Sequence, residues 1–108
     1  MAAAVEGTPP ARARPWTFLS NHGHVLVQVS RDPEARLRDI AAGVGITERA
    51  AQSILVDLEQ GGYVSKTRVG RRNSYRVHDD LPFRHPAESA HAVGELLRIF
   101  SDAEAPAG

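Results

Sequence analysis

The residues best suited to chemistry in this 108-residue chain are five cations that stand close together. No carboxylate occurs from position 61 to position 78, although the chain as a whole has 13 basic and 13 acidic residues and no net charge. Basic side chains concentrated in this way attract phosphate groups. The five are Lys66, Arg68, Arg71, Arg72 and Arg76. We expect Arg71 and Arg72 to enter a narrow minor groove of duplex DNA and the other three to bind backbone phosphate.

A second set of polar residues precedes the cations and has the side-chain types that read base edges. Arginine pairs with guanine at two points, glutamine pairs with adenine, hydroxyls bond either base edge or phosphate, and an alanine methyl touches the thymine methyl. The set is Thr47, Arg49, Ala50, Gln52 and Ser53. We expect these residues to contact DNA bases. In the alternative interpretation Arg49 only solvates the start of a helix, and Gln52 carries most of the readout.

Two short helices joined by a glycine turn are expected to position this second set. Ile40, Ala41 and Val44 recur at helical spacing, and Gly45 permits a left-handed turn. Thr47 can then cap the following helix. The inward positions of that helix are Ala51, Ile54, Leu55 and Leu58. The pattern predicts a helix-turn-helix, although any two amphipathic helices of a small bundle could share it.

The flanking segments complete a small domain. Ser20 or Asn21 can cap a first helix that runs to about Arg31, and we expect Trp16 to anchor this helix to the core or to a partner subunit.

Glycines at 61 and 62 end the third helix. Two strands around the tip GRRN follow, and this basic hairpin has the form of a wing; the alternative is a solvated hairpin whose charges prevent edge association.

The C-terminal segment predicts a last helix that begins at Pro86, since proline suits the first helical position. Apolar residues then form a stripe at Val93, Leu96, Leu97 and Phe100. We expect this stripe to pair with a second copy, where Gly94 would permit close approach. The alternative is that the stripe packs on the chain's own first helix.

We therefore expect an α+β, mainly helical fold: a winged helix-turn-helix with a three-helix core, a two-stranded basic wing and an extra C-terminal helix. Residues 1–15 and 102–108 are expected to be a disordered arm and tail. Residues 16–78 would form the DNA-binding domain, and 79–101 the connector and dimerisation helix.

Composition excludes several classes of protein. The chain has no cysteine, which excludes disulfides and cysteine-ligated zinc. It has no apolar run of membrane-spanning length and no leader-like N-terminus, so we expect a cytoplasmic, nucleoid-associated protein. No enzyme motif is present and no cofactor is expected.

From about Trp16 to Phe100 the sequence resembles the multiple-antibiotic-resistance (MarR) and arsenic-repressor (ArsR) families of bacterial winged helix-turn-helix regulators. The similar parts are LRDIAAGVGIT with Ala41 and Gly45, LEQGGYV, and GRRNSYRV. The resemblance implies a homodimeric, sequence-specific regulator of transcription that binds double-stranded DNA. The cysteine motif of the metal-sensing arsenic-repressor members is missing, and whether a small-molecule effector is bound stays open.

Two other hypotheses are kept beside this one. A metal sensor could use His78, Asp79, Asp80, His85 and His91, since imidazole and carboxylate ligands suit zinc or nickel. A winged helix used only for protein contact is the main rival function. It predicts a neutral wing and an apolar exposed helix face, and the sequence has neither.

Overall fold

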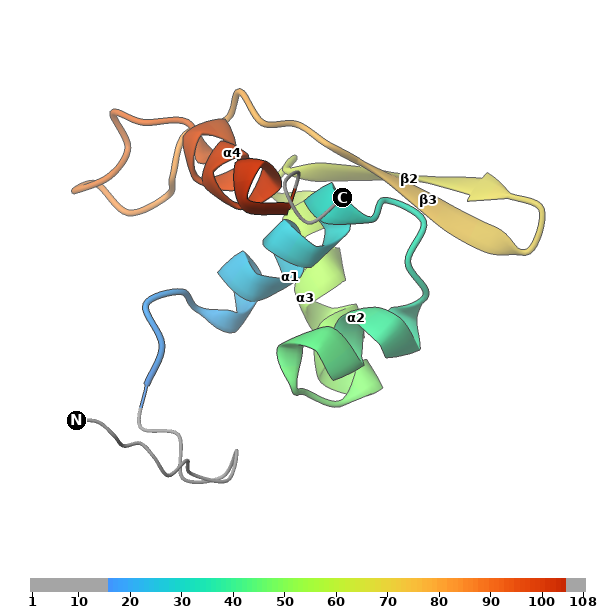
Figure 1. The fold of residues 1–108 in the computed structure, drawn as a ribbon. Helices are drawn as coiled ribbons and strands as arrows, with labels where there is room; N and C mark the ends of the chain where they lie inside the picture. The colour runs from blue at the N-terminus through green and yellow to red at the C-terminus, as the bar shows by residue number, and fades with distance from the viewer. Residues whose placement is uncertain (1–15, 105–108) are drawn as a thin grey trace.

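The computed structural model describes residues 16–104 of the chain. Within them lie four helices and one antiparallel pair of strands (Figure 1). The elements are α1 (Asn21–Arg31), α2 (Leu37–Val44), α3 (Glu48–Gln60), β2 (Val64–Val69), β3 (Arg72–Val77) and α4 (Val93–Glu104). The expected disorder of residues 1–15 and 105–108 falls outside the described residues. Helix α4 continues to Glu104, and the disorder of the tail stays a prediction.

Helix α1 begins and ends as its sequence predicts. The Ser20 hydroxyl oxygen accepts from the Gly23 backbone N–H at 3.2 Å, which satisfies one of the free donors of the first turn. The helix ends at Arg31, just before the Asp32–Pro33 pair. Its inward side chains are Val25, Leu26, Val27 and Val29, all buried. This helix is therefore the centre of the core.

The aromatic residues before α1 do not anchor it to this core. The Trp16 side chain is 67% exposed and that of Phe18 is 93% exposed. The prediction that Trp16 packs into the core of its own chain is therefore wrong. Contact with a partner subunit, the other half of that prediction, stays a prediction.

Helices α2 and α3 are joined by the expected glycine turn. Gly45 has φ 88°, a left-handed conformation that costs glycine little, and its N–H and that of Ile46 both donate to the Ala41 carbonyl. The Thr47 hydroxyl oxygen accepts from the Ala50 N–H at 3.0 Å and caps α3. Ala41 and Ala51 are buried, and the two helices pack against each other and against α1.

A tight hairpin follows α3. Gly62, with φ 87°, reverses the chain, and β2 then pairs with β3 from Val64 opposite Val77 to Val69 opposite Arg72. Only Gly70 and Arg71 form the tip, with positive φ at Gly70, the pattern of a type II′ turn. Arg72 therefore belongs to β3. Tyr75 is buried, and Val77, on the same face, packs against the core.

The last helix begins later than predicted. Residues 84–91 form consecutive turns, and Pro86 lies in this loop and not in a helix. Backbone bonds close the loop, from Phe83 N to His91 O and from Val93 N to Leu81 O. The Ala92 N–H then donates to the Glu95 carboxylate, which caps α4. These tertiary bonds override the local preference of proline for a helix start, so the prediction that α4 begins at Pro86 is wrong.

The Glu95 carboxylate at this cap has a perturbed titration. A hydrogen bond from the His91 ring, 2.8 Å from Glu95 Oε1, lowers the pKa of Glu95 below its ordinary range, and the Ala92 N–H acts in the same direction. The cap is therefore held in its charged form.

Part of the predicted dimer stripe lies inside the single chain. Val93 and Leu97 are 5% and 7% exposed and pack in the core that includes α1. Gly94 is also buried, and its N–H donates to the Asp79 carbonyl at 2.9 Å. The close approach that Gly94 permits is thus to Asp79 of its own chain. Val93 and Leu97 pack as in the alternative, within the chain's own core, and pairing of the stripe with a second copy stays a prediction. Leu96 and Phe100 are only half-buried.

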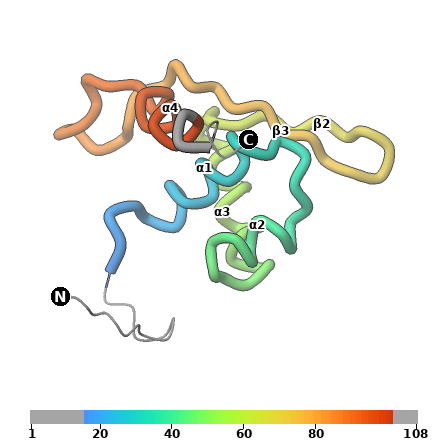
Figure 2. The backbone as a smooth tube through the Cα atoms, in the orientation of Figure 1, coloured from blue at the N-terminus to red at the C-terminus, as the bar shows by residue number. Residues whose placement is uncertain are grey.

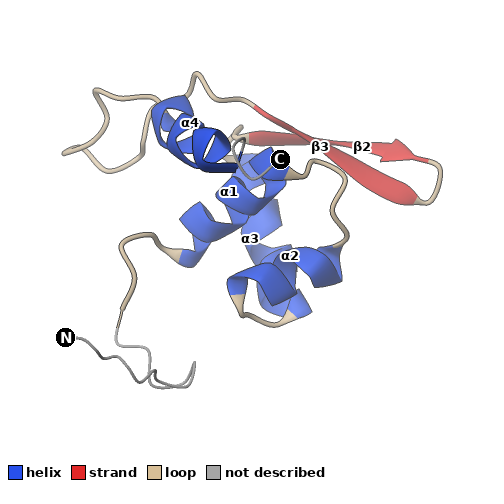
Figure 3. Cartoon of the chain, in the orientation of Figure 1, coloured by secondary structure: helices blue, strands red, loops and turns tan. Residues whose placement is uncertain are grey.

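The whole arrangement is a small α+β domain with a projecting hairpin, compatible with a winged helix. The link between α1 and α2 passes beside β3 (Figure 2), where Tyr75 N donates to Pro33 O at 2.9 Å. The helices gather on one side and the two strands extend beyond them (Figure 3). Within residues 16–104, no helix combines the length and apolarity needed to cross a membrane.

Candidate nucleic-acid interface

The outer face of α3 carries the residues predicted to read DNA bases. Arg49, Gln52 and Ser53 are exposed and lie three and four positions apart, so their side chains leave the helix on one side. Ala50 is half-buried beside them. This face points away from the core, because the opposite stripe of α3 packs on α1 and α2.

Thr47, at the start of this face, is the N-cap of α3. Its hydroxyl oxygen accepts the Ala50 N–H and so holds the first turn of α3. The hydroxyl proton is still available for donation, because a hydroxyl donates and accepts at once. Thr47 can therefore cap α3 and bond a phosphate with the same group.

The strand register divides the cations of the wing between its two faces. Residues directly opposite in an antiparallel pair share a face, and successive residues alternate. Lys66 lies opposite Tyr75, and Arg68 opposite Asn73, which places these two cations on the face that holds Tyr75. Arg72 and Arg76 lie on the other face, and Arg71 stands at the tip. The five cations do not form one flat patch.

A hollow of about 390 Å³ joins α3 to the wing. Gln52 lines it from α3, Arg71 and Arg72 line it from the hairpin, and Arg36 lines it from the residue before α2. The one carboxylate among the lining residues belongs to Glu34. Three arginines and Gln52 therefore line one concave surface, and this excess of positive charge suits an anionic partner.

Arg72 also binds the protein itself. Its Nη2 donates to the backbone carbonyl of Glu34 at 2.8 Å, in the link between α1 and α2. One end of the guanidinium is thus occupied in attaching the start of β3, next to the tip, to the α1–α2 link, and its other N–H groups remain as donors. Arg71 is exposed at the tip and is the less constrained of the pair.

Arg76 is separated from the hollow between α3 and the wing. It lines a different depression, near the start of α4, together with Asp79 and Arg98. The structure thus brings Gln52, Arg71 and Arg72 together and leaves Arg76 beside α4, where a carboxylate is close in sequence and lines the same depression.

Tyr75 secures the wing from the inside. Its side chain is 8% exposed, and this burial raises the pKa of the Tyr75 phenol, against a smaller lowering by a hydrogen bond with Asn73. The phenol stays neutral under ordinary conditions, as a core group should. Together with the bond from Tyr75 N to Pro33 O, it ties β3 to the helical body.

The residues of the metal hypothesis do not gather. Among residues 16–104 no group of three or more histidine, cysteine, aspartate or glutamate side chains is arranged to hold an ion. His78 Nε2 lies 2.6 Å from the Ser65 hydroxyl, and His91 pairs with Glu95. The predicted cluster therefore lacks a geometric basis.

Sequence reasoning missed Arg36. It has the extended backbone of a helix N-cap but no capping hydrogen bond from its side chain, so nothing in the helix pattern pointed to it. Its place in the hollow depends on how the α1–α2 link passes beside the hairpin, which is a tertiary fact.

Comparison of the chain with models of known protein families gives no match, and comparison with curated proteins also gives none.

Proposed function

We propose that this chain is a winged helix-turn-helix transcription regulator that binds double-stranded DNA in a sequence-specific manner. In this proposal α2 and α3 form the helix-turn-helix, α3 enters the major groove, and the hairpin of β2 and β3 is the wing. The proposal assigns the protein no catalytic step, metal or effector.

One observation carries the proposal: Gln52 on the exposed face of α3 and Arg71 and Arg72 of the wing line the same concave surface. A duplex placed against that surface would meet a base-reading amide and phosphate-binding cations at once. A solvated hairpin that only avoids aggregation has no need to face a helix in this way.

The two parts of the surface have different tasks. Arg49, Gln52 and Ser53 project from α3 and can distinguish base pairs, while Thr47 is suited to phosphate. Arg71 and Arg72, with Lys66 and Arg68 further along the wing, supply affinity that does not depend on sequence. Arg76 is left out of this assignment because of its position near α4.

The test is selection of bound duplexes from a random DNA pool at about physiological salt, where non-specific attraction is weak and base readout persists. Enrichment of one sequence would support the proposal, and an inverted repeat would indicate that the protein acts as a homodimer. No enrichment from a protein with an intact thermal transition would overturn it and would favour a winged helix used only for protein contact.

A further inference from the structure

Two large aromatic side chains stand in solvent just before α1. The Trp16 and Phe18 rings meet edge to face with centroids 5.0 Å apart, and they are 67% and 93% exposed. Aromatic residues are enriched in protein interfaces, and contiguous exposed apolar surface marks such contact sites. Neither ring belongs to the nucleic-acid surface described above.

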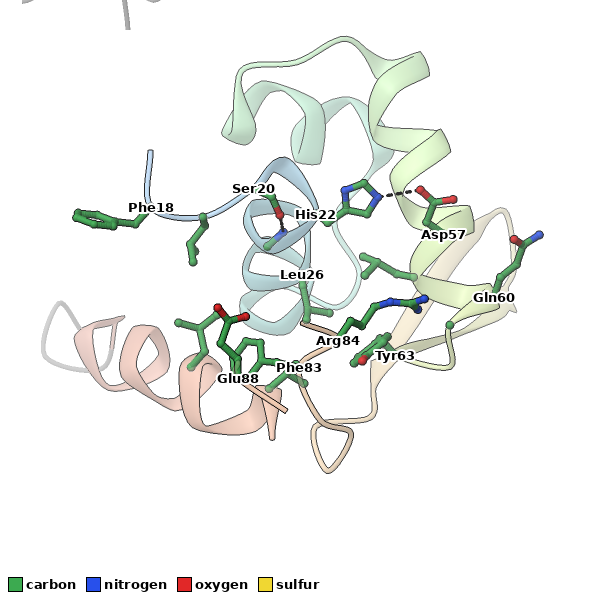
Figure 4. Close-up of a pocket in the computed structure, with 16 residues that line it drawn as sticks. Phe18, Ser20, His22, Leu26, Asp57, Gln60, Tyr63, Phe83, Arg84 and Glu88 are labelled. Atoms are coloured by element: carbon green, nitrogen blue, oxygen red, sulfur yellow. Dashed lines mark hydrogen bonds and ion pairs between the residues drawn. The ribbon is translucent and has the colours of Figure 1, made fainter. Parts of the chain in front are cut away.

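A cavity of about 660 Å³ opens beside this aromatic pair. It lies between α1, the C-terminal end of α3, the loop at residues 83–88 and α4 (Figure 4). Its apolar lining includes Leu26, Leu58, Tyr63 and Leu96. On the wall between α1 and α3, His22 Nε2 and Asp57 Oδ2 are 2.8 Å apart, which ties the two helices together there.

The protrusion and the cavity are neighbours on one surface. Phe18 is a rim residue of the cavity, yet its ring points away from it (Figure 4). The chain's own aromatic pair therefore leaves the cavity open. A surface that carries a protruding aromatic pair beside an open cavity is complementary to itself, as a two-fold symmetric contact between identical chains requires.

Charge on the rim agrees with a second copy as the occupant. Arg84 and Glu88 both line the cavity, so the rim holds both signs. A two-fold rotation can bring the cation of one copy to the carboxylate of the other, so the rim is complementary to itself. A strongly charged partner such as nucleic acid would find no such match here.

We propose that Trp16 and Phe18 of one copy enter the cavity of a second copy, and the reverse, in a two-fold symmetric dimer. A cavity of this volume is within the range of roughly 300–1,000 Å³ that encloses a drug-sized molecule, so it has room for both rings. Aromatic anchors in such pockets dominate the energy of protein interfaces.

This dimer differs from pairing through the α4 stripe. Leu97 is buried in the single chain and does not line the cavity, so the contact uses the open side of the cavity, where Val93 and Leu96 are the lining residues from that stripe. This dimer deepens the proposed function and rests on it. One domain covers about one DNA half-site, so two copies are needed to cover a pair of half-sites.

The experiment uses Trp16 as its own reporter, because it is the single tryptophan of the chain. Emission wavelength and acrylamide quenching are measured over a wide range of protein concentration, alongside sedimentation equilibrium. We expect emission to shift to the blue and quenching to fall as the dimer forms. A protein that stays monomeric throughout, or a dimer in which Trp16 is still fully quenched, would overturn the proposal.

Matched variants locate the contact. Phe18→Ser changes a residue that is 93% exposed and whose ring, among the described residues, meets only the exposed Trp16 ring, and we expect dimerisation to weaken at least tenfold with an unchanged melting temperature. Val69→Ser, at a residue 59% exposed on the wing, is the control and should leave association unchanged. Equal weakening by both variants would contradict the proposal. So would a dimer that is lost in Ile99→Glu, on the exposed side of α4, but kept in Phe18→Ser.

DNA binding separates this inference from the proposed function. A wild-type protein that dimerises with Trp16 protected but selects no DNA would refute the regulator proposal and leave the dimer standing. A protein that selects DNA as a monomer with Trp16 exposed would do the opposite.

Discussion

Arg71 and Arg72 are adjacent in the sequence but have different surroundings. Arg71 occupies the tip of the wing, whereas Arg72 is in β3 and donates to the Glu34 carbonyl. A cation that only meets DNA can be removed without effect on folding. A cation that also satisfies a backbone carbonyl contributes to stability as well, by up to about 1 kcal/mol for an exposed bond such as this one.

This difference gives a prediction for two single variants. Arg71→Gln should weaken binding to all DNA sequences and lower the slope of log affinity against log salt by about 0.9, the value for one lost phosphate contact. Its melting temperature should not change. Arg72→Gln should lower the slope in the same way and also reduce stability by up to about 1 kcal/mol. Salt titrations and urea melts of both variants measure this. An Arg72→Gln protein as stable as wild type would show that the Glu34 bond is not made in solution.

Gln52 gives a prediction of another kind. Gln52→Ala removes an amide that can pair with adenine at two points, so preference at one base pair should fall by about 1–3 kcal/mol. Affinity for random DNA and the salt slope should be unchanged, because no phosphate contact is lost. Competition with duplexes that differ at single positions tests this. A uniform loss over all sequences would contradict the base-reading role.

At the scale of elements, local signals were sufficient for α1, α2, α3 and the hairpin. Ser20, Thr47 and Gly45 act through hydrogen bonds to residues close in the sequence. Hydrophobic periodicity and capping residues therefore predict these elements from the sequence. The start of α4 could not be read in this way. Pro86 offers a local helix start, but the bonds of Phe83 with His91 and of Val93 with Leu81 decide the boundary, and these join segments that only the tertiary fold brings together.

The candidate site was predictable to a similar degree. The exposed face of α3 follows from helical period, so Arg49, Gln52 and Ser53 were found from sequence. The place of Arg76 near α4, and that of Arg36 in the hollow, depend on strand register and on the path of the α1–α2 link. Neither is encoded in a local pattern.

Substitution of Gly94, the buried glycine of α4, tests how closely this helix packs against Asp79. A Cβ at Gly94 would stand 2.7 Å from the Asp79 carbonyl oxygen, which is backbone and yields little. Gly94→Ala should therefore lower stability by about 1–3 kcal/mol, as overpacking does. Gly43→Ala in α2 is the matched control. Its Cβ would meet only the flexible end of Gln28, so the better helix propensity of alanine should leave stability unchanged or raised by up to about 1 kcal/mol.

Denaturant melts of the two variants decide the matter. If Gly94→Ala were as stable as Gly43→Ala, α4 would not pack closely against Asp79 in solution. The packing of α4 on the core would then differ from that described above.

At the scale of the whole molecule, three helices, the wing base and α4 share one core. Val25, Val29 and Ile40 are almost completely buried, and no polar or charged side chain is buried among the described residues. A domain of this size has a net stability of only about 5–10 kcal/mol, so one defect in the shared core affects every element.

Ile54→Asp should therefore unfold the domain. Ile54 is 7% exposed on the inner stripe of α3, where a carboxylate would lack a partner, and the expected cost of more than about 4 kcal/mol approaches the total stability. Loss of the cooperative thermal transition by circular dichroism is the expected result. Ser53→Asp, one residue earlier on the exposed face, should keep the transition. A cooperative melt for Ile54→Asp would contradict the core assignment.

The bonds that hold the wing to the α1–α2 link have a consequence for the binding reaction itself. Arg72 and Tyr75 attach β3 to Glu34 and Pro33 before any partner arrives, so the conformational entropy of the wing is already lost in folding. Association with DNA should then resemble docking of a preorganised surface. Calorimetry should show a small change in heat capacity, without the large negative value of a segment that folds as it binds.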